Sequence, residues 1–320
     1  MPDTDVALAD IRRAAERIDG IAQRTPVMTS RSFDAESGLQ AFFKCENFQK
    51  GGAFKIRGAS NFILSVPKED LARGVVAHSS GNHAQAVAIA ARTVGASATL
   101  VMPEDAPRAK MEATRAQGAR IVTYNRLKDD RSAISAEISG RTGATVVPPY
   151  DHPWIIAGQG TTALELLEQQ PDLGALAVCI GGGGLISGCA IAAKCLNPSI
   201  RIFGVEPANA NDTYLSLAAG RRMTMPTPAP DTIADGLRTP VPGELTFPIV
   251  QRHVERIVLV TEDEIRAAVK FLLVRMKILV EPSGAVAAAA ALFNKLPSGL
   301  GRVGVVLSGG NVDYEQLASL

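Results

Sequence analysis

The sequence lacks two features that would point to a membrane or to a polyanion as partner. No stretch of about 18 consecutive apolar residues occurs, so no segment predicts a transmembrane helix. An excess of charge of one sign is also missing, because 33 Lys and Arg residues oppose 32 Asp and Glu residues, for a net charge of +1. A nearly neutral chain has no general attraction for nucleic acid or an anionic lipid surface. We therefore expect neither a nucleic-acid nor a membrane partner.

Cysteine is scarce, and its spacing excludes two further classes of protein. The four cysteines lie within or beside apolar stretches and show no C-x-x-C spacing. This pattern is typical of reduced, mostly buried thiols rather than of a disulfide framework or a zinc site. The N-terminal residues mix acids and bases and lack the apolar core of a signal peptide. These features predict a cytoplasmic protein.

Short β-branched runs alternate with alanine-rich stretches along most of the chain, which predicts an α/β fold. The runs cover residues 74–78, 98–102, 120–124, 175–180, 201–206 and 302–308. Several runs are apolar throughout, as in parallel strands that are covered on both faces. With 320 residues the chain is long enough for two modest domains.

Three glycine-containing loops follow predicted strands, at the edge where parallel sheets bind ligands. They are SSGNH (79–83), GGGG (181–184) and SGGN (308–311). Four glycines before a helix allow backbone N–H groups to converge on a phosphate, whereas a tight turn needs only one or two. The nicotinamide pattern G-x-G-x-x-G fails at Ile186 and Ser187, and no G-x-x-x-x-G-K-[ST] loop occurs. SSGNH fits either a carboxylate site or a helix capped by Ser79 or Ser80.

Lys55 lies between Phe54 and Ile56, in the stretch GGAFKI. Most lysines in apolar surroundings extend their charged end to solvent. A buried lysine instead has a lowered pKa, and its neutral amine can attack a carbonyl carbon to form a Schiff base. Because no side chain provides that carbonyl, the second interpretation requires pyridoxal phosphate or a carbonyl substrate.

Eight sequence blocks occur in an order that resembles serine racemases and serine/threonine dehydratases. They are FQKGGAFKIRGASN (48–61), HSSGNHAQA (78–86), AGQGT (157–161), GGGGLISG (181–188), GVEPANAND (204–212), TIADG (232–236), EPSGA (281–285) and LSGGNVD (307–313). The resemblance covers nearly the whole chain. It is closest to short serine racemases and 3-hydroxyaspartate dehydratases, which lack a C-terminal regulatory domain.

The resemblance implies a fold-type II pyridoxal-phosphate enzyme, similar to the tryptophan synthase β subunit. Such a fold has two open, twisted parallel-sheet domains with the cofactor in the cleft between them. For this chain it implies a large cofactor-binding domain (1–73 plus 151–320) and a small mobile domain (74–150). It also implies a homodimer with an amino acid as its small-molecule substrate.

The same resemblance assigns the residues that would hold the cofactor. Lys55 would be the Schiff-base lysine and the catalytic base, Phe54 would lie beside the ring, Asn82 would bind the 3-hydroxyl, and Ser308 would meet the pyridine nitrogen. The phosphate would be held by Gly181, Gly182, Gly183, Gly184 and Leu185.

The substrate residues are assigned in the same way. The α-carboxylate would be bound by Ser79, Ser80, Gly81, Asn82 and His83. Ser80 would also face the substrate from the side opposite the lysine, so that it could return a proton there. Arg131 matches a family arginine at the mouth of the site, although it fits a surface charge equally well. Gln117 departs from the tyrosine that relatives often carry, which puts in doubt any role of that aromatic in closing the small domain.

A divalent-cation site of close relatives matches Glu206, the backbone carbonyl of Ala210 and Asp212. On its own, E-x5-D after a strand is commonly a solvated turn. The resemblance implies Mg²⁺, or Ca²⁺ or Mn²⁺, because these ions prefer hard oxygen ligands.

These assignments predict β-elimination from small β-hydroxy amino acids. We expect 3-hydroxyaspartate and serine to be favoured, giving oxaloacetate or pyruvate and ammonia, with Arg131 or His83 as the cation for a second carboxylate. The alternatives are a serine racemase with dehydratase side activity and a catabolic threonine dehydratase. A synthase that performs β-replacement with a thiol would share Lys55 and the glycine loops, but HSSGNH argues against it. A cofactor-free binding protein is the remaining alternative.

Overall fold

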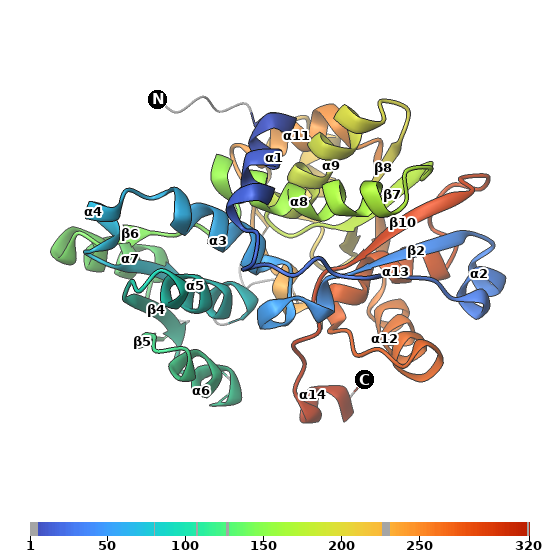
Figure 1. Cartoon of the computed structure of the whole chain (residues 1–320). Coiled ribbons are helices and arrows are strands. Elements are labelled where there is room, and N and C mark those ends of the chain that lie inside the picture. Colours follow the sequence, from blue (N-terminus) through green and yellow to red (C-terminus); the bar gives the residue numbers. More distant parts are fainter. Residues whose placement is uncertain (1–5, 80, 107, 126–127, 226–230, 319) are drawn as a thin grey trace.

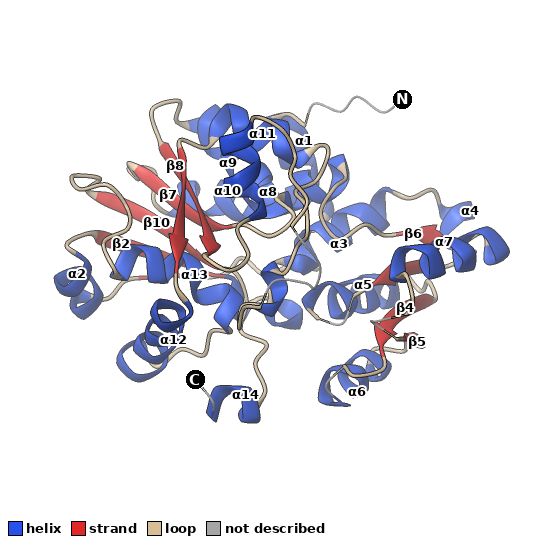
Figure 2. Ribbon diagram, turned by 180° about the vertical axis from the view of Figure 1, so that it is seen from behind, coloured by secondary structure: helices blue, strands red, loops and turns tan. Residues whose placement is uncertain are grey.

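The computed structural model describes residues 6–79, 81–106, 108–125, 128–225, 231–318 and 320 (Figure 1). Its strands form two separate sheets, each covered by helices (Figure 2). The α/β fold and the two parallel-sheet units predicted from the sequence are therefore confirmed. No helix within the described ranges is both long and apolar enough to cross a membrane.

The larger sheet has six strands in the order β1-β2-β10-β7-β8-β9. Neighbouring strands are parallel except for β1 and β2, which pair antiparallel at one edge. The strands are β1 (Val27–Met28), β2 (Gln40–Cys45), β7 (Ala175–Cys179), β8 (Arg201–Pro207), β9 (Arg256–Val260) and β10 (Arg302–Leu307). The runs at 175–180, 201–206 and 302–308 correctly predict β7, β8 and β10, whereas the pattern does not identify β1, β2 or β9.

Helices cover both faces of this sheet (Figures 1 and 2). On one face lie α1 (Leu8–Arg17), α8 (Pro153–Gln169), α9 (Gly184–Leu196) and α11 (Thr246–His253). On the other lie α2 (Arg31–Ser37), α12 (Glu262–Phe271) and α13 (Pro282–Leu292). The remaining elements of this part are α10 (Asp212–Ala219), α14 (Tyr314–Ala318), the 3₁₀ turns η1 (Glu46–Phe48), η2 (Lys50–Gly52) and η3 (Asp235–Leu237), and the π-helical turn η4 (Leu272–Met276).

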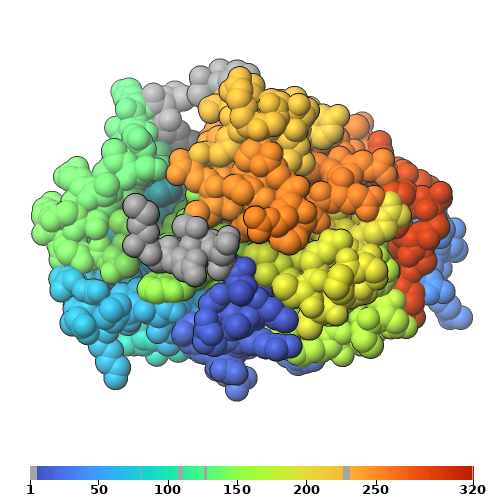
Figure 3. Space-filling model, turned by 90° about the horizontal axis from the view of Figure 1, so that it is seen from above, coloured from blue at the N-terminus to red at the C-terminus, as the bar shows by residue number. Residues whose placement is uncertain are grey.

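The smaller sheet has four parallel strands in the order β5-β4-β3-β6. They are β3 (Val75–His78), β4 (Ala98–Pro103), β5 (Arg120–Tyr124) and β6 (Thr145–Val146). The helices near it are α3 (Lys55–Ser65), α4 (Lys68–Leu71), α5 (Asn82–Thr93), α6 (Arg108–Ala116) and α7 (Arg131–Thr142). Seen from above, the chain of this sheet (cyan to green) and most of the chain of the larger sheet (yellow to red) form adjoining parts of the surface (Figure 3).

Alternate side chains of β3 enter two different apolar clusters. Val75 and Ala77 pack with residues of α3 and α5, while Val76 packs with Ile138 of α7. Strand β3 is therefore buried on both faces, which explains why its first three residues are all apolar. Helix α3 precedes residue 74 in the sequence but packs in the cluster of the smaller sheet, so apolar contacts cross the predicted domain boundary.

Helices α3 and α8 pack closely against each other at two glycines. A Cβ atom added to Gly158 on α8 would lie 2.7 Å from the carbonyl oxygen of Arg57 and from Cα of Gly58 on α3. Such distances are far inside van der Waals contact, so any side chain at Gly158 would push α3 away from α8. This close approach helps to set the position of Lys55, the first residue of α3.

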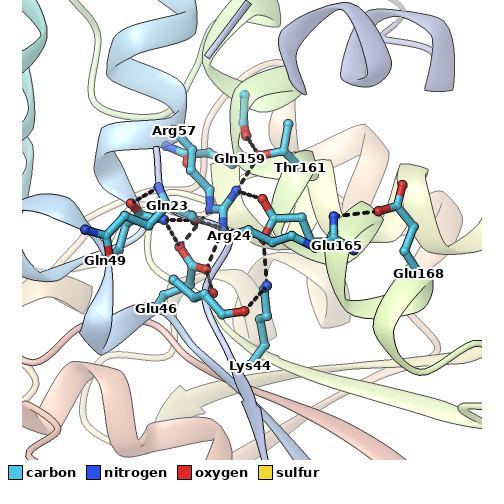
Figure 4. Close-up of polar contacts among 12 residues, drawn as sticks. Gln23, Arg24, Lys44, Glu46, Gln49, Arg57, Gln159, Thr161, Glu165 and Glu168 are labelled. Carbon is cyan, nitrogen blue, oxygen red and sulfur yellow. Dashed lines mark hydrogen bonds and ion pairs between the residues drawn. The ribbon is translucent and has the colours of Figure 1, made fainter. Parts of the chain in front are cut away.

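A buried cluster of four charges joins β2, η1, α3 and α8 (Figure 4). The Arg57 guanidinium donates to both oxygens of Glu46, at 2.7 and 2.8 Å, and to both oxygens of Glu165, at 2.7 and 2.8 Å. The ammonium of Lys44 lies 2.6 Å from Glu165. Burial alone would raise the pKa of Glu46, but the charge of Arg57 holds it below its ordinary value. Each buried charge thus has an opposite partner.

Candidate active site

One pocket collects residues from the carboxyl ends of strands in both sheets. His78 ends β3, Cys179 ends β7 and Ser308 directly follows β10, and all three line this pocket. The pocket is lined by every described residue to which the sequence assigned a cofactor or substrate role: Phe54, Lys55, Ser79, Gly81, Asn82, His83, Arg131, Gly181, Gly182, Gly183, Gly184, Leu185 and Ser308. Ser80 lies outside the described residues. The structure thus brings residues from position 54 to position 308 into one cavity.

Lys55 is the first residue of α3 and its amine points into the protein. The Nζ atom donates a 2.8 Å hydrogen bond to the carbonyl oxygen of Pro149 and lies 5.2 Å from the centre of the Phe54 ring. Burial lowers the pKa of Lys55 to about 8, against a small opposing effect of Cys179. The side chain does not extend to solvent, and its neutral form is accessible near physiological pH.

The four glycines connect β7 to the amino terminus of α9. Gly183 has φ +91°, a conformation that residues with a side chain rarely adopt. A Cβ atom at Gly182 would overlap the ring of Tyr150, and one at Gly183 would lie 2.7 Å from Oγ1 of Thr246. The loop therefore requires glycine for close packing as well as for its turn. The free N–H groups at the start of α9, together with the helix dipole, suit a phosphate.

The loop after β3 leads into α5, which begins at Asn82. The residue before the helix is Gly81, and no side chain among the described residues caps it. Ser79 Oγ instead accepts a hydrogen bond from the Gly81 amide, at 3.2 Å. Ser79 therefore does not cap the helix, and Ser80, the other predicted cap, lies outside the described residues.

The amide of Asn82 is oriented by two partners. Its Nδ2 donates a 2.6 Å hydrogen bond to Oε1 of Glu281, and its Oδ1 accepts a 2.9 Å bond from Nδ2 of Asn311. Because an amide group has two N–H bonds, one donor remains for a ligand in the pocket.

His83 is buried and its Nε2 lies 3.1 Å from the carbonyl oxygen of Val147. Burial, and then the charge of Lys55, lowers the pKa of His83 to about 3. The lowered pKa favours the neutral ring near pH 7, which makes His83 less suited than Arg131 to supply the cation for a second carboxylate. Arg131, the exposed first residue of α7, remains at the pocket as the candidate cation.

Several pocket residues have no role in the sequence interpretation. They include Tyr150, Cys179, Asp235, Arg238, Glu281 and Ser283. Asp235 lies in the block TIADG, and Glu281 and Ser283 lie in EPSGA, so these blocks carried a signal that was not assigned to residues. Cys179 could have been identified as the last residue but one before the glycine loop.

A second polar site lies outside this pocket, where β8 leads into α10. Glu206 and Asp212 are fully buried. Glu206 accepts bonds from the amides of Thr213 (3.1 Å) and Tyr214 (2.8 Å), whereas among the described residues neither carboxylate oxygen of Asp212 has a hydrogen-bond partner. Burial raises the pKa of Asp212 to about 7, and burial together with the nearby Asp212 raises that of Glu206 to about 8. Buried carboxylate oxygens without partners fit a bound cation.

The cation site has few protein side chains of the type that bind metals. Within the ranges that the structure describes, no group of three or more His, Cys, Asp and Glu residues is placed to hold an ion. Ala210, which lies between Glu206 and Asp212 in the sequence, is buried and could bind an ion only through its backbone carbonyl. Any ion there would depend on two carboxylates and backbone or water oxygens, as hard cations permit.

Comparisons with known proteins agree with this geometry. The family model described as "Pyridoxal-phosphate dependent enzyme" matches residues 18–309. An L-threo-3-hydroxyaspartate ammonia-lyase from Pseudomonas sp is 48% identical over 97% of both chains. A serine racemase from Schizosaccharomyces pombe is 47% identical over 97% of this chain and 95% of its own. The structure of maize serine racemase superposes with a TM-score of 0.93 at 45% identity, covering 98% of this chain and 96% of that one. The chain therefore belongs to the family of pyridoxal-phosphate dependent enzymes.

Proposed function

We propose that the protein catalyses β-elimination from small β-hydroxy amino acids, with 3-hydroxyaspartate and serine favoured, to give a keto acid and ammonia. The observation that supports this most is the pocket itself, which joins the amine of Lys55, the glycine loop and the Ser308 hydroxyl. The relatives above act on the same class of amino acid, as their names state.

The residues of the pocket fit pyridoxal phosphate. Lys55 would bind the aldehyde, Gly181 to Gly184 with Leu185 would hold the phosphate, Asn82 would donate to the 3-hydroxyl beside the ring-stacking Phe54, and Ser308 would meet the ring nitrogen. When bound, this cofactor withdraws electrons from the substrate Cα. Lys55 would then remove the Cα proton, for which its lowered pKa suits it.

The loop 79–83 would bind the substrate α-carboxylate. Ser79, Gly81 and Asn82 line the pocket at the start of α5, where backbone N–H groups suit an anion, and the ring of His83 would orient the loop through Val147. Ser80 would return a proton to Cα from the face opposite Lys55. Return before the β-hydroxyl departs would racemise serine, so a serine racemase with dehydratase activity is the second candidate function.

The choice among substrates would depend on Arg131. A guanidinium at the pocket suits the second carboxylate of 3-hydroxyaspartate, which serine and threonine lack. Threonine, the substrate of the third candidate function, would place a methyl group there and gain nothing from the charge.

We further propose that Glu206, Asp212 and the carbonyl of Ala210 bind Mg²⁺, or Ca²⁺ or Mn²⁺. The buried carboxylates with raised pKa values support this, because a cation would compensate their charge. The site lies outside the pocket, so the ion would stabilise the β8–α10 connection rather than contact substrate.

Residues 74–150 would act as a mobile domain that closes over the substrate. They contain the whole four-stranded sheet, and they contribute His83 and Arg131 to the pocket. Closure would exclude water from the reaction and bring Arg131 nearer to the substrate.

A homodimer in the cytoplasm is proposed as the working form. Phe48, Val274 and Leu279 are between 38% and 50% exposed, and Asn47 joins two of their segments by donating to the carbonyl oxygen of Leu279. An exposed apolar surface of this kind suits a subunit interface. Three of the four thiols, those of Cys45, Cys179 and Cys189, are free and buried, as suits a reducing compartment.

The central test is covalent labelling of Lys55. Borohydride reduction of the purified holoenzyme should attach the cofactor to Lys55, as peptide mass spectrometry would show. Label on another lysine, or none, would refute the proposed function. Assays with L-serine, L-threonine and the threo and erythro isomers of 3-hydroxyaspartate, with keto acid and D-serine measured separately, then rank the candidate functions. A thiol added to the serine assay tests for β-replacement.

A further inference from the structure

Two pocket residues at the centre of the larger sheet make a contact that the proposed function does not use. Cys179 ends β7 and Ser308 follows β10, and these strands pair in parallel. The Cys179 thiol donates a 3.4 Å hydrogen bond to Oγ of Ser308. Both residues line the pocket, yet they are only 3% and 4% exposed. The contact therefore lies in the wall of the pocket, shielded from solvent.

The thiol is a neutral donor at physiological pH. Burial raises the pKa of Cys179 to about 11, and the bond to Ser308 opposes this shift only in part. A thiolate would place a negative charge in this wall and could only accept a hydrogen bond. The protonated thiol instead has one proton to give, and Ser308 Oγ receives it.

The hydrogen bond from Cys179 determines the direction in which the Ser308 hydroxyl can donate its own proton. A hydroxyl group has one proton and two lone pairs. In the part of the chain that the structure describes, the Cys179 thiol is the only side chain that hydrogen-bonds to this hydroxyl. With one lone pair occupied by the thiol proton, the hydroxyl's own proton points away from Cys179 and is available to an acceptor in the pocket.

We propose that Cys179 is a positioning residue that directs the proton of Ser308 at the ring nitrogen of the bound cofactor. The inference rests on the proposed function, which places that nitrogen at Ser308. A nitrogen that accepts this hydrogen bond stays unprotonated, since its lone pair is already occupied. Cys179 would thereby help to keep the ring a weak electron acceptor, which favours prompt elimination over transamination.

The test compares two ligands and two backgrounds. Apoprotein is titrated with pyridoxal phosphate and with its analogue in which a C–H group replaces the ring nitrogen. Cys179→Ala should weaken binding of pyridoxal phosphate about threefold to tenfold, the factor expected for one neutral hydrogen bond, and leave binding of the analogue unchanged. In a Ser308→Ala background the same substitution should have no effect on either ligand.

A spectroscopic measurement accompanies the titration. The ¹⁵N chemical shift of a labelled ring nitrogen in the holoenzyme should change in Cys179→Ala, because its hydrogen bond weakens. Cys189→Ala is the matched control: it removes another buried thiol, on α9, that does not line the pocket, and should change neither binding nor the shift. If Cys179→Ala does not fold, Cys179→Val keeps the volume without the donor and replaces it.

Four outcomes would overturn the inference. Equal weakening of both ligands, equal weakening in both backgrounds, or an unchanged ¹⁵N shift would show that Cys179 acts by packing alone. If Ser308→Ala does not distinguish pyridoxal phosphate from the analogue, the assignment of Ser308 fails and the role of Cys179 fails with it. Labelling of Lys55 decides separately whether the cofactor binds, so the two failures are distinguishable.

Discussion

Asn82 donates a 2.6 Å hydrogen bond to Glu281, a residue 199 positions away in the sequence. Both residues line the pocket, Asn82 at the start of α5 near the smaller sheet and Glu281 just before α13 of the larger one. The bond therefore connects the two sheet units across the site and fixes the plane of the Asn82 amide.

Glu281→Ala should weaken binding of pyridoxal phosphate to the apoprotein by about tenfold or more. A hydrogen bond to a charged group is worth more than a neutral one, and its loss would free the Asn82 amide to rotate. Glu281→Gln keeps an acceptor oxygen and should cost less. Titration of the apoproteins by absorbance measures both. No loss in either variant would show that the contact is irrelevant to cofactor binding, and equal losses would show that an acceptor oxygen cannot replace the carboxylate.

The rate at which the apoprotein combines with the cofactor aldehyde should depend on the pKa of Lys55. Only the neutral amine attacks the aldehyde, so the rate should rise about tenfold per pH unit below the pKa and level off above it. Because burial lowers that pKa from 10.5 to about 8, the plateau should begin near pH 8. Stopped-flow absorbance checks this, and a rate still rising steeply at pH 10 would contradict it. Lys55→Ala should show no such reaction and no turnover.

Arg57→Ala should lower the free energy of unfolding by about 3–5 kcal/mol, because it leaves the Glu46 carboxylate buried without its main partner. The matched control is Arg24→Ala. Arg24 pairs with Glu168 in the same region, but both side chains are about half exposed, and the loss should be at most about 1 kcal/mol. Figure 4 shows both pairs. Urea unfolding measures the difference, and equal effects would argue against a stabilising role of the buried cluster.

Removal of divalent cations should lower the melting temperature, and more so at high pH. The folded-state pKa values of Glu206 and Asp212, about 8 and 7, lie above their ordinary values of 4.5 and 3.8. Without an ion, these groups therefore lower stability progressively as the pH rises from about 4 to 8, since each must ionise while buried. Added Mg²⁺ should restore the lost stability, by an amount that grows with the Mg²⁺ concentration relative to its dissociation constant.

The control for the cation prediction is Asp212→Asn, which removes one of the two charges. Its melting temperature should respond much less to EDTA and to Mg²⁺ than that of the unsubstituted protein. Calorimetry at pH 6 and pH 8 measures these responses. A change in melting temperature of the same size in both proteins would place the ion elsewhere. No response in either would exclude the site.

The alternation of apolar β-branched runs with alanine-rich segments was sufficient to predict the α/β fold. It identified β3, β4, β5, β7, β8 and β10, because parallel strands covered on both faces are mostly apolar, although β5 is partly exposed. It did not identify β1, β2 or β9. Two residues are too few for β1 to show any pattern, and Gln40 and Lys44 interrupt β2 with polar side chains that the tertiary structure accommodates.

The sequence by itself determined which residues could perform the chemistry: Lys55 in an apolar setting, glycine loops after strands, and ordered blocks that resemble one enzyme family. These are local signals, written in neighbouring residues. Only the tertiary structure decided that burial lowers the pKa of His83, that Asn82 is held by Glu281, that the Asp212 carboxylate has no hydrogen-bond partner among the described residues, and that Cys179 donates to Ser308. Each of these depends on burial and on partners contributed by segments far apart in the chain, and neither can be read from the residues next to it.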